Sequence, residues 1–233
     1  MADPVNPKIT CLDANGFVEL LGTFGDDLTV VNAARVSFAK ESKQITEGDK
    51  KLIRYLAKHN HITPFFHPQA RLRLKMPIYV AREWFRHTIG FARNEVSRRY
   101  VDSEPECYMP QEAGVRARDS NKKQGSKDTP VEAADVAVAK IQAAQVAAMD
   151  TYKELLAAGV APEVARGVLP QSMYTEFIET GSLSAYARLC RLRCDPQAQA
   201  EIREYAAAVS ALLEPCFPVS WECLKADWTP ESA

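Results

Sequence analysis

Hydrophobic and polar positions alternate with a period of two in several short stretches, the pattern of β-strands with one buried face. Apolar runs at 8–13 and 17–24 flank an Asn-Gly pair typical of tight turns, and they predict a β-hairpin. Residues 69–75 alternate apolar residues with arginine or lysine, which predicts a strand with one buried and one cationic face. A further strand is predicted over 173–178.

Elsewhere apolar residues recur three and four positions apart, which predicts amphipathic helices. Asp26 and Asp27 are placed to cap the first helix, and Gly159 to close the longest, which is rich in alanine. The predicted helices cover residues 27–36, 47–58, 78–85, 130–159, 162–169, 182–193 and 196–213. Strands early in the chain, followed mostly by helices, indicate an α+β fold.

One domain, 1–233, is expected, because the chain has 233 residues of which 46% are hydrophobic, enough to bury a sizeable core. Residues 102–128 are rich in proline, glycine, serine and charge, and predict a mobile loop that is either a lid or a simple insertion. The alanine-rich helices offer packing surfaces to other helices, so oligomerisation is expected.

The formal net charge of −1 argues against general nucleic-acid binding, which requires a strongly basic surface. Any phosphate ligand is therefore expected to be small. No apolar run approaches the length of a membrane span, and no opening segment has the character of a signal peptide. We expect a cytoplasmic protein that binds neither nucleic acid nor membranes.

The six cysteines lack the paired close spacing of a zinc ribbon or of a disulfide framework. Cys190 and Cys194 lie one helical turn apart and would supply half of a metal site, but no second pair is near. Buried reduced thiols are the favoured interpretation, and no metal is expected.

The densest polar chemistry is the run from Arg86 to Tyr100, which holds four arginines together with His87 and Glu95. Such a run is often a solvated face. Here it follows an apolar helix and contains its own acidic residue, which favours a ligand site. Because arginine binds phosphate through two parallel hydrogen bonds, the predicted ligand is an anion, with a nucleotide as the first hypothesis.

Three histidines, His59, His61 and His67, surround Thr63 in the stretch HNHITPFFH. The stretch lacks both an HExxH pattern and a carboxylate, which argues against a metal. The interpretations left open are a turn that binds a cofactor and a purely structural loop.

A third cluster contains Arg166 and three arginines, Arg188, Arg191 and Arg193, on the helix predicted over 182–193. Taken alone, it is either an anion site or the solvated side of an amphipathic helix. The common nucleotide-binding loops and nucleophile motifs are absent, and no cysteine lies within the polar clusters, so thiol catalysis is not favoured.

In this order, the clusters resemble the flavin-dependent thymidylate synthases over nearly the whole chain. The matching blocks are FVELLGTFGDDLTVVNAARVSF, HNHITPFFH, MPIYVAREWFRH, NEVSRRY, GVAPEVARGVLPQSMYTEF and RLRCDPQAQAEI. The resemblance implies an antiparallel β-sheet flanked by helices, in a homotetramer whose active sites are shared between subunits. It also implies that FAD, NADPH, methylenetetrahydrofolate and dUMP bind, and that the pyrimidine is methylated at C5 without a cysteine nucleophile.

The resemblance further implies roles for individual residues. The positions aligned with cofactor contacts are Ser37, His61, Thr63, Arg86, His87, Thr88, Glu95 and Arg188. The positions aligned with the nucleotide site are Glu83, Arg86, Glu95, Ser97, Arg98, Arg99, Arg166 and Arg193. Of these, Arg193 matches the catalytic arginine that polarises the pyrimidine, and its guanidinium would stabilise developing negative charge.

Several positions depart from the family's pattern and imply rearranged flavin contacts. Thr88 stands where an arginine is usual, and Arg93 is a candidate to restore that cation. The other departures are Phe66 for a glutamate, Ser182, Leu183 and Ser184 for Asn-Ala-Arg, and Arg188 for an asparagine. These changes keep open an alternative of another class, a non-catalytic nucleotide-binding relative.

Glu83 replaces a usual glutamine, so a side chain that can donate has become one that only accepts when ionised. One hypothesis is that it accepts the 4-amino group of dCMP, which would make the protein a dCMP C5 methylase or hydroxymethylase. The alternative is that Glu83 pairs with Arg82, Arg86 or Arg99.

Overall fold

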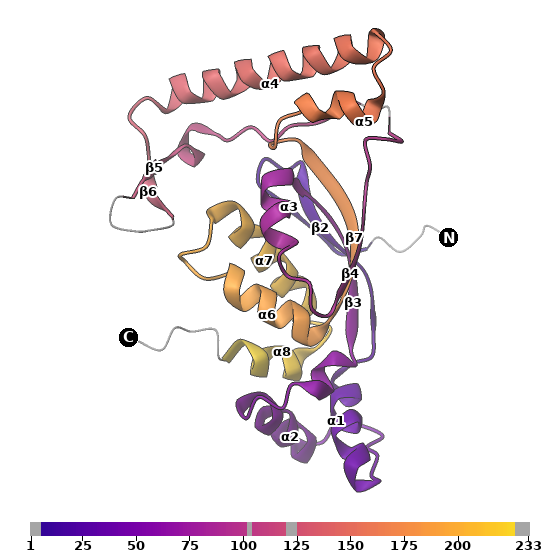
Figure 1. The fold of residues 1–233 in the computed structure, drawn as a ribbon. Coiled ribbons are helices and arrows are strands. Elements are labelled where there is room, and N and C mark those ends of the chain that lie inside the picture. The colour runs from indigo at the N-terminus through magenta and orange to yellow at the C-terminus, as the bar shows by residue number, and fades with distance from the viewer. Residues whose placement is uncertain (1–5, 102–103, 120–124, 227–233) are drawn as a thin grey trace.

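The computed structural model of the chain describes residues 6–101, 104–119 and 125–226. Its centre is an antiparallel five-stranded sheet in the order β1-β2-β3-β7-β4 (Figure 1). The strands are β1 (Lys8–Cys11), β2 (Gly16–Phe24), β3 (Gln69–Pro77), β4 (Phe91–Glu95) and β7 (Tyr174–Ser182). A second, two-stranded sheet joins β5 (Arg116–Arg118) to β6 (Ser126–Pro130).

The helices are α1 (Asp27–Arg35), α2 (Glu47–Lys58), α3 (Ile78–Trp84), α4 (Ala134–Ala157), α5 (Pro162–Ala165), α6 (Leu183–Arg193), α7 (Ala200–Leu213) and α8 (Pro218–Lys225). Short 3₁₀ turns are η1 (Val36–Phe38), η2 (Thr63–Phe66), η3 (Glu112–Gly114) and η4 (Arg166–Val168). In Figure 1, α4 and α5 lie at one end of the molecule and α1 and α2 at the other, with the sheet and α6 to α8 between them. The α+β class with an antiparallel sheet is therefore confirmed.

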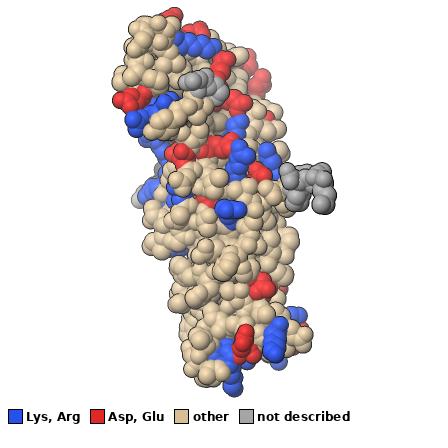
Figure 2. Space-filling model, turned by 90° about the vertical axis from the view of Figure 1, so that its right-hand side faces the viewer, with Lys and Arg blue, Asp and Glu red and all other residues tan. Residues whose placement is uncertain are grey.

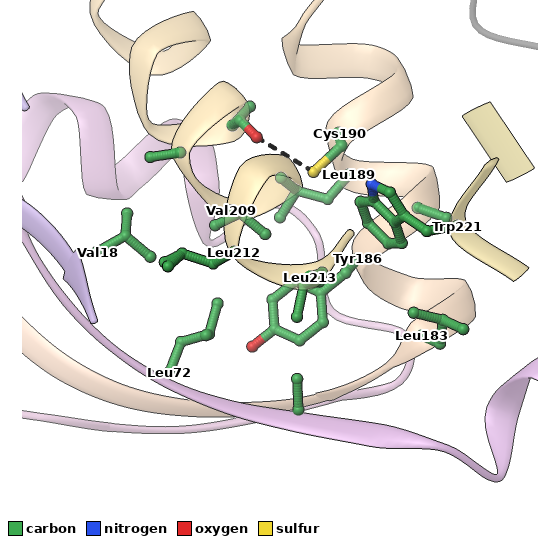
Figure 3. Close-up of a cluster of buried hydrophobic side chains, with 14 of the residues drawn as sticks. Val18, Leu72, Leu183, Tyr186, Leu189, Cys190, Val209, Leu212, Leu213 and Trp221 are labelled. Carbon is green, nitrogen blue, oxygen red and sulfur yellow. Dashed lines mark hydrogen bonds between the residues drawn. The ribbon is translucent and has the colours of Figure 1, made fainter. Parts of the chain in front are cut away.

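The core lies between one face of the sheet and α6, α7 and α8 (Figure 3). Leu72 on β3 is fully buried in it, as are Leu189 on α6 and Trp221 on α8. Burial of large apolar side chains contributes roughly 1.5–3 kcal/mol each. Within this core the Cys190 thiol lies 3.5 Å from the carbonyl oxygen of Ala206. All six cysteines are free thiols, as predicted, although four of them are only partly buried.

The predicted hairpin is confirmed, but its turn differs from the expected one. Gly16 already pairs with Cys11 across the two strands. The left-handed backbone conformations fall instead on Leu12 and Ala14, with φ of 57° and 66°. The predicted cap at Asp26 is confirmed, since its side chain accepts a hydrogen bond from the backbone N–H of Thr29 at the start of α1. Ser182, which was not predicted as a cap, does the same for the backbone N–H of Ala185 at the start of α6.

Two stretches contain strands that were not predicted from the sequence. The run from Arg86 to Tyr100 contains β4, which forms because β7 offers it a free edge for pairing. The predicted loop at 102–128 contains η3, β5 and part of β6, while its residues 102–103 and 120–124 lie outside the described residues. Its mobility stays a prediction.

The ends of other elements also differ from the predicted ones. Helix α4 begins at Ala134 rather than at 130, because Pro130 still belongs to β6. Helix α7 begins at Ala200 rather than at 196. Strand β7 continues past 178 to Ser182, and α8 was not predicted at all.

Neither a membrane-spanning helix nor a metal-binding cluster is found among the described residues. Within them, no helix is both long and apolar enough to cross a membrane. Nor does the described part of the chain hold a group of three or more His, Cys, Asp or Glu side chains placed to bind a metal ion.

Candidate active site

The ends of α3 and α6 meet at an ion pair. Glu83, in the last turn of α3, accepts a hydrogen bond from Nη1 of Arg193, the final residue of α6. Nη2 of Arg193 donates to the backbone oxygen of Glu83 over 3.5 Å. A cation is favoured at the C-terminal end of a helix, where backbone carbonyl oxygens lack partners. Glu83 therefore forms an ion pair, as one interpretation predicted, but its partner is Arg193 rather than Arg82, Arg86 or Arg99.

His87 completes this cluster from just beyond α3. Its Nε2 accepts a hydrogen bond from Nε of Arg193 over 2.9 Å. Burial of the ring lowers the pKa of His87 to about 4, and the nearby cations of Arg193, Arg188, Arg93 and Arg86 act in the same direction. The imidazole is therefore neutral near pH 7, with the lone pair on Nε2 available to Arg193.

A cavity of about 800 Å³ adjoins this cluster. Glu83 and Arg193 lie in its wall, together with the start of β6 and the segment that joins α6 to α7. Arg116 and Arg203 also line it, and Arg116 donates to Glu201 over 2.8 Å. Sequence reasoning missed Arg116 and Arg203, because the first belongs to the stretch predicted as a loop and neither lies in a motif.

The loop from Thr88 to Gly90 packs closely against the start of α6. Gly90 has φ of 81°, and a Cβ there would lie 2.9 Å from both the Ala185 methyl group and the Ser182 hydroxyl oxygen. The same position is 3.4 Å from the Phe66 ring of η2. The tertiary fold therefore brings the HNHITPFFH turn next to the arginine run.

Arg188 reaches this loop from α6, where its Nη2 donates to the backbone oxygen of Ile89 over 2.9 Å. Arg188, Arg86 and Thr88 are all exposed. Two cations and a hydroxyl thus flank one short loop, an arrangement suited to a phosphate.

Arg93 does not extend this cation group. Its Nε donates to the fully buried carboxylate of Glu179, and its guanidinium lies 4.7 Å from the centre of the Phe91 ring. Trp84 Nε1 lies 3.3 Å from the same carboxylate. The hypothesis that Arg93 restores the missing cation is wrong, because the protein itself neutralises this arginine.

A second polar group follows the far end of β4. Glu95 accepts a hydrogen bond from the Thr175 hydroxyl over 2.6 Å, and Ser97 Oγ accepts one from the backbone N–H of Arg99 over 3.3 Å. The guanidinium of Arg99 lies 3.1 Å from Glu163 on α5. Arg166, directly after α5, is exposed, and Arg98 is partly buried.

Within one chain, the predicted site residues therefore form separate groups. Glu83 and His87 precede β4, and Arg193 of α6 bonds to both of them, whereas the residues from Glu95 to Arg99 lie at or beyond the end of β4, with Arg166 near them. The five residues of β4 span roughly 16 Å at about 3.3 Å per residue.

Ser37 follows α1, His61 and Thr63 follow α2, and all three are exposed. Helices α1 and α2 form one end of the molecule (Figure 1). The rings of His59 and His61 flank Tyr55, at 4.3 and 5.8 Å between ring centres. Packing against the Tyr55 ring accounts for the positions of both histidines without a metal ion.

Comparisons with known proteins agree on one family. Residues 19–219 match the family model described as thymidylate synthase complementing protein. A flavin-dependent thymidylate synthase of Thermus thermophilus is 39% identical over 206 residues, which cover 88% of this chain and 74% of the relative. One from Thermotoga neapolitana is 40% identical over 217 residues, covering 92% and 93% of the two chains.

Solved structures show the same relationship. The UMP/dUMP methylase PolB from Streptomyces cacaoi bound with 5-Br dUMP superposes with a TM-score of 0.82 at 30% identity. The match covers 94% of this chain and 97% of PolB. A second structure of PolB contains 5-Br UMP and matches with the same TM-score at 29% identity.

Proposed function

The chain belongs to the flavin-dependent thymidylate synthase family, and on this premise we propose that it methylates dUMP at C5 to form dTMP with the help of a flavin. It is accordingly a methyltransferase and a flavoprotein of dTMP biosynthesis. Among the described residues, the observation that carries the proposal is the position of Arg193, which lies in the wall of a cavity of about 800 Å³.

The chemistry of Arg193 fits the reaction. A guanidinium has five N–H donors, and three of them contact His87 and Glu83, so two remain for a substrate. Two donors beside the pyrimidine carbonyl would stabilise the negative charge that develops on the ring. Arg193 needs no proton transfer for this role, because its charge is fixed.

The residues around the loop from Thr88 to Gly90 fit a flavin nucleotide, and we assign FAD to them. Arg86 and Arg188 would hold its phosphates, with Thr88 and Thr63 as further hydrogen-bond partners. His61 and Ser37 extend this set, and His87 adjoins it, with its Nε2 bonded to Arg193. When bound, the reduced flavin supplies the hydride that completes the methyl group, and NADPH and methylenetetrahydrofolate are the proposed co-substrates.

The second polar group fits the 5'-phosphate of the nucleotide. Arg99 pairs with Glu163, which lies shortly before Arg166 in the chain, so the two arginines are near one another. Each guanidinium would bind phosphate through two parallel hydrogen bonds. Ser97 and Arg98 complete this part of the site, and Glu95 lies between it and the flavin residues along the chain.

We further propose that the protein is a cytoplasmic homotetramer in which one site takes residues from more than one subunit. In one chain, β4 separates Arg193 from the residues assigned to the phosphate, and a second subunit would supply the missing half. Phe24, Val36 and Phe38 are between 71 and 75% exposed, as expected of residues that meet another subunit. Figure 2 also shows a broad surface with few charged side chains between the two ends of the molecule.

The dCMP alternative is less well supported than dUMP. Glu83 has a counterion in Arg193, which accounts for its charge without an amino group on the substrate. The ligands in the two PolB structures are both uracil nucleotides.

The test is product analysis after incubation of the purified protein with FAD, NADPH, methylenetetrahydrofolate and either dUMP or dCMP. We expect a yellow protein, formation of dTMP, and tritium release from dUMP labelled at C5. Tritium release from C5-labelled dCMP, with none from labelled dUMP, would establish dCMP as the substrate. A protein that binds dUMP but stays colourless with added FAD, and releases no tritium, would be a non-catalytic relative.

A further inference from the structure

The Arg193 guanidinium is held at all three of its nitrogen atoms. Nε donates to His87 Nε2 over 2.9 Å, Nη1 to the Glu83 carboxylate and Nη2 to the Glu83 backbone oxygen over 3.5 Å. The guanidinium is planar, so contacts at its three corners fix both its position and its plane. A single ion pair would leave the plane free to turn.

Both holding residues come from the same short stretch. Glu83 lies in α3, and His87 follows the helix closely, with its backbone N–H bonded to the Trp84 oxygen over 3.1 Å. Trp84 itself is fully buried. The two acceptors are therefore anchored to the core through Trp84, while Arg193 comes from a different helix.

This ion pair is partly open to solvent. The Arg193 and Glu83 side chains are 18% and 24% exposed, at the wall of an open cavity. Partly exposed pairs are screened by solvent and add little stability. The structural consequence of these contacts is the fixed orientation of the guanidinium.

We propose that Glu83 and His87 are positioning residues that hold the Arg193 guanidinium at the pyrimidine ring. The inference rests on the proposed function, and it gives Glu83 a role that differs from contact with an amino group of the substrate. The Glu83 carboxylate also balances part of the charge of Arg193, so Glu83 sets both the direction and the strength of the two remaining donors.

The experiment compares Glu83→Ala, Glu83→Gln and wild type as flavin-loaded enzyme, with rates expressed per bound flavin. Glu83→Ala frees the guanidinium, and we expect kcat for dUMP to fall about 10- to 100-fold, since misplacement by an ångström costs up to about that much. KM for dUMP should change less than about threefold, because the residues assigned to the phosphate are untouched. Glu83→Gln keeps an acceptor oxygen for Nη1, so its kcat should be at least about tenfold higher than that of Glu83→Ala.

Glu176→Gln is the matched control. Glu176 forms an ion pair with Arg73 on the sheet, and the variant should keep kcat within about twofold of wild type. Should Glu83→Ala not accumulate as folded flavoprotein, Glu83→Asp takes its place, because it keeps the charge but shortens the side chain by one methylene. We expect Glu83→Asp also to lower kcat.

The outcomes separate the two proposals. An inactive wild type would refute the proposed function, and this inference with it. An active wild type with unchanged kcat in Glu83→Ala, or in Glu83→Asp if that variant is used, would overturn the inference alone. So would equal losses in Glu83→Ala and Glu83→Gln, since the acceptor oxygen would then be irrelevant.

Discussion

Arg193 donates its Nε–H to Nε2 of His87 over 2.9 Å, so the imidazole must leave that nitrogen unprotonated in the folded chain. The contact joins a residue after α3 to the end of α6. In the folded chain, this contact therefore requires the neutral form of His87, with Nε2 as the acceptor.

The first prediction concerns stability and pH. The pKa of His87 is about 4 in the folded chain, against an ordinary value of 6.5, because burial and neighbouring arginines disfavour the charged form. As pH falls, the unfolded chain therefore binds the proton first. The stability due to neutral His87 is complete above about pH 6.5, declines between about pH 6.5 and 4, and declines no further below that.

Urea unfolding at pH 7, 6 and 5 measures this effect. Relative to His87→Gln, the wild type should lose at most about 1.4 kcal/mol of unfolding free energy per pH unit, the limit for one proton. A difference between the two proteins that stays constant from pH 7 to pH 5 would contradict the assigned protonation state.

The second prediction concerns the buried pair of Glu179 and Arg93. Glu179→Ala leaves the Arg93 guanidinium, only 15% exposed, without its counterion. We expect a loss of about 3–5 kcal/mol in unfolding free energy, the range for breaking a buried pair. The measurement is chemical denaturation.

A double variant provides the control for this pair. Replacing both residues by leucine removes both charges, so it should cost less than Glu179→Ala alone. If the double variant were less stable than Glu179→Ala, the pair would stabilise the sheet by more than the neutralisation of its two charges.

The third prediction separates backbone strain from crowding in the loop beside α6. Gly90 and Gly159 both have φ of 81°, but a Cβ at Gly159 meets nothing within 4 Å. Gly159→Ala should therefore cost about 1–2 kcal/mol, for the left-handed conformation alone. Gly90→Ala should cost roughly 1–3 kcal/mol more, because its methyl group collides with Ala185 and Ser182.

Unfolding free energies of both glycine variants, with flavin content of the purified proteins, check this prediction. Gly90→Ala should also bind flavin more weakly, because the loop carries Thr88 and the Arg188 contact. Equal stability of the two variants would show that the loop yields easily to the extra methyl group.

The fourth prediction tests whether subunits share sites. Arg166→Ala and Arg193→Ala should each be nearly inactive alone. If each site takes these arginines from different subunits, random mixing of the two variants regenerates intact sites, roughly a quarter of the total for equal amounts. Turnover of dUMP after joint refolding is the measurement, with Arg54→Ala, an exposed arginine of α2, as the active control.

If the two arginines instead act within one chain, the mixture stays as inactive as its components. A monomer in sedimentation experiments would contradict the homotetramer directly.

Local patterns along the chain account for much of the fold. Alternation over 69–75 predicted β3, and the capping residue Asp26 predicted the start of α1, because these signals act within a few residues. Strand β4 was missed, because its residues form a strand only when β7 supplies hydrogen-bond partners from 82 to 90 positions away.

The sequence by itself determined the family, the α+β class and the kinds of side chain available for a nucleotide and a flavin. Only the tertiary structure decided which charges face each other. It paired Glu83 with Arg193 and buried Arg93 against Glu179, across separations of 110 and 86 residues. Residue types and their local spacing can be read from the sequence. The partner of a charged side chain depends on which helices and strands pack together, and the whole core determines that packing.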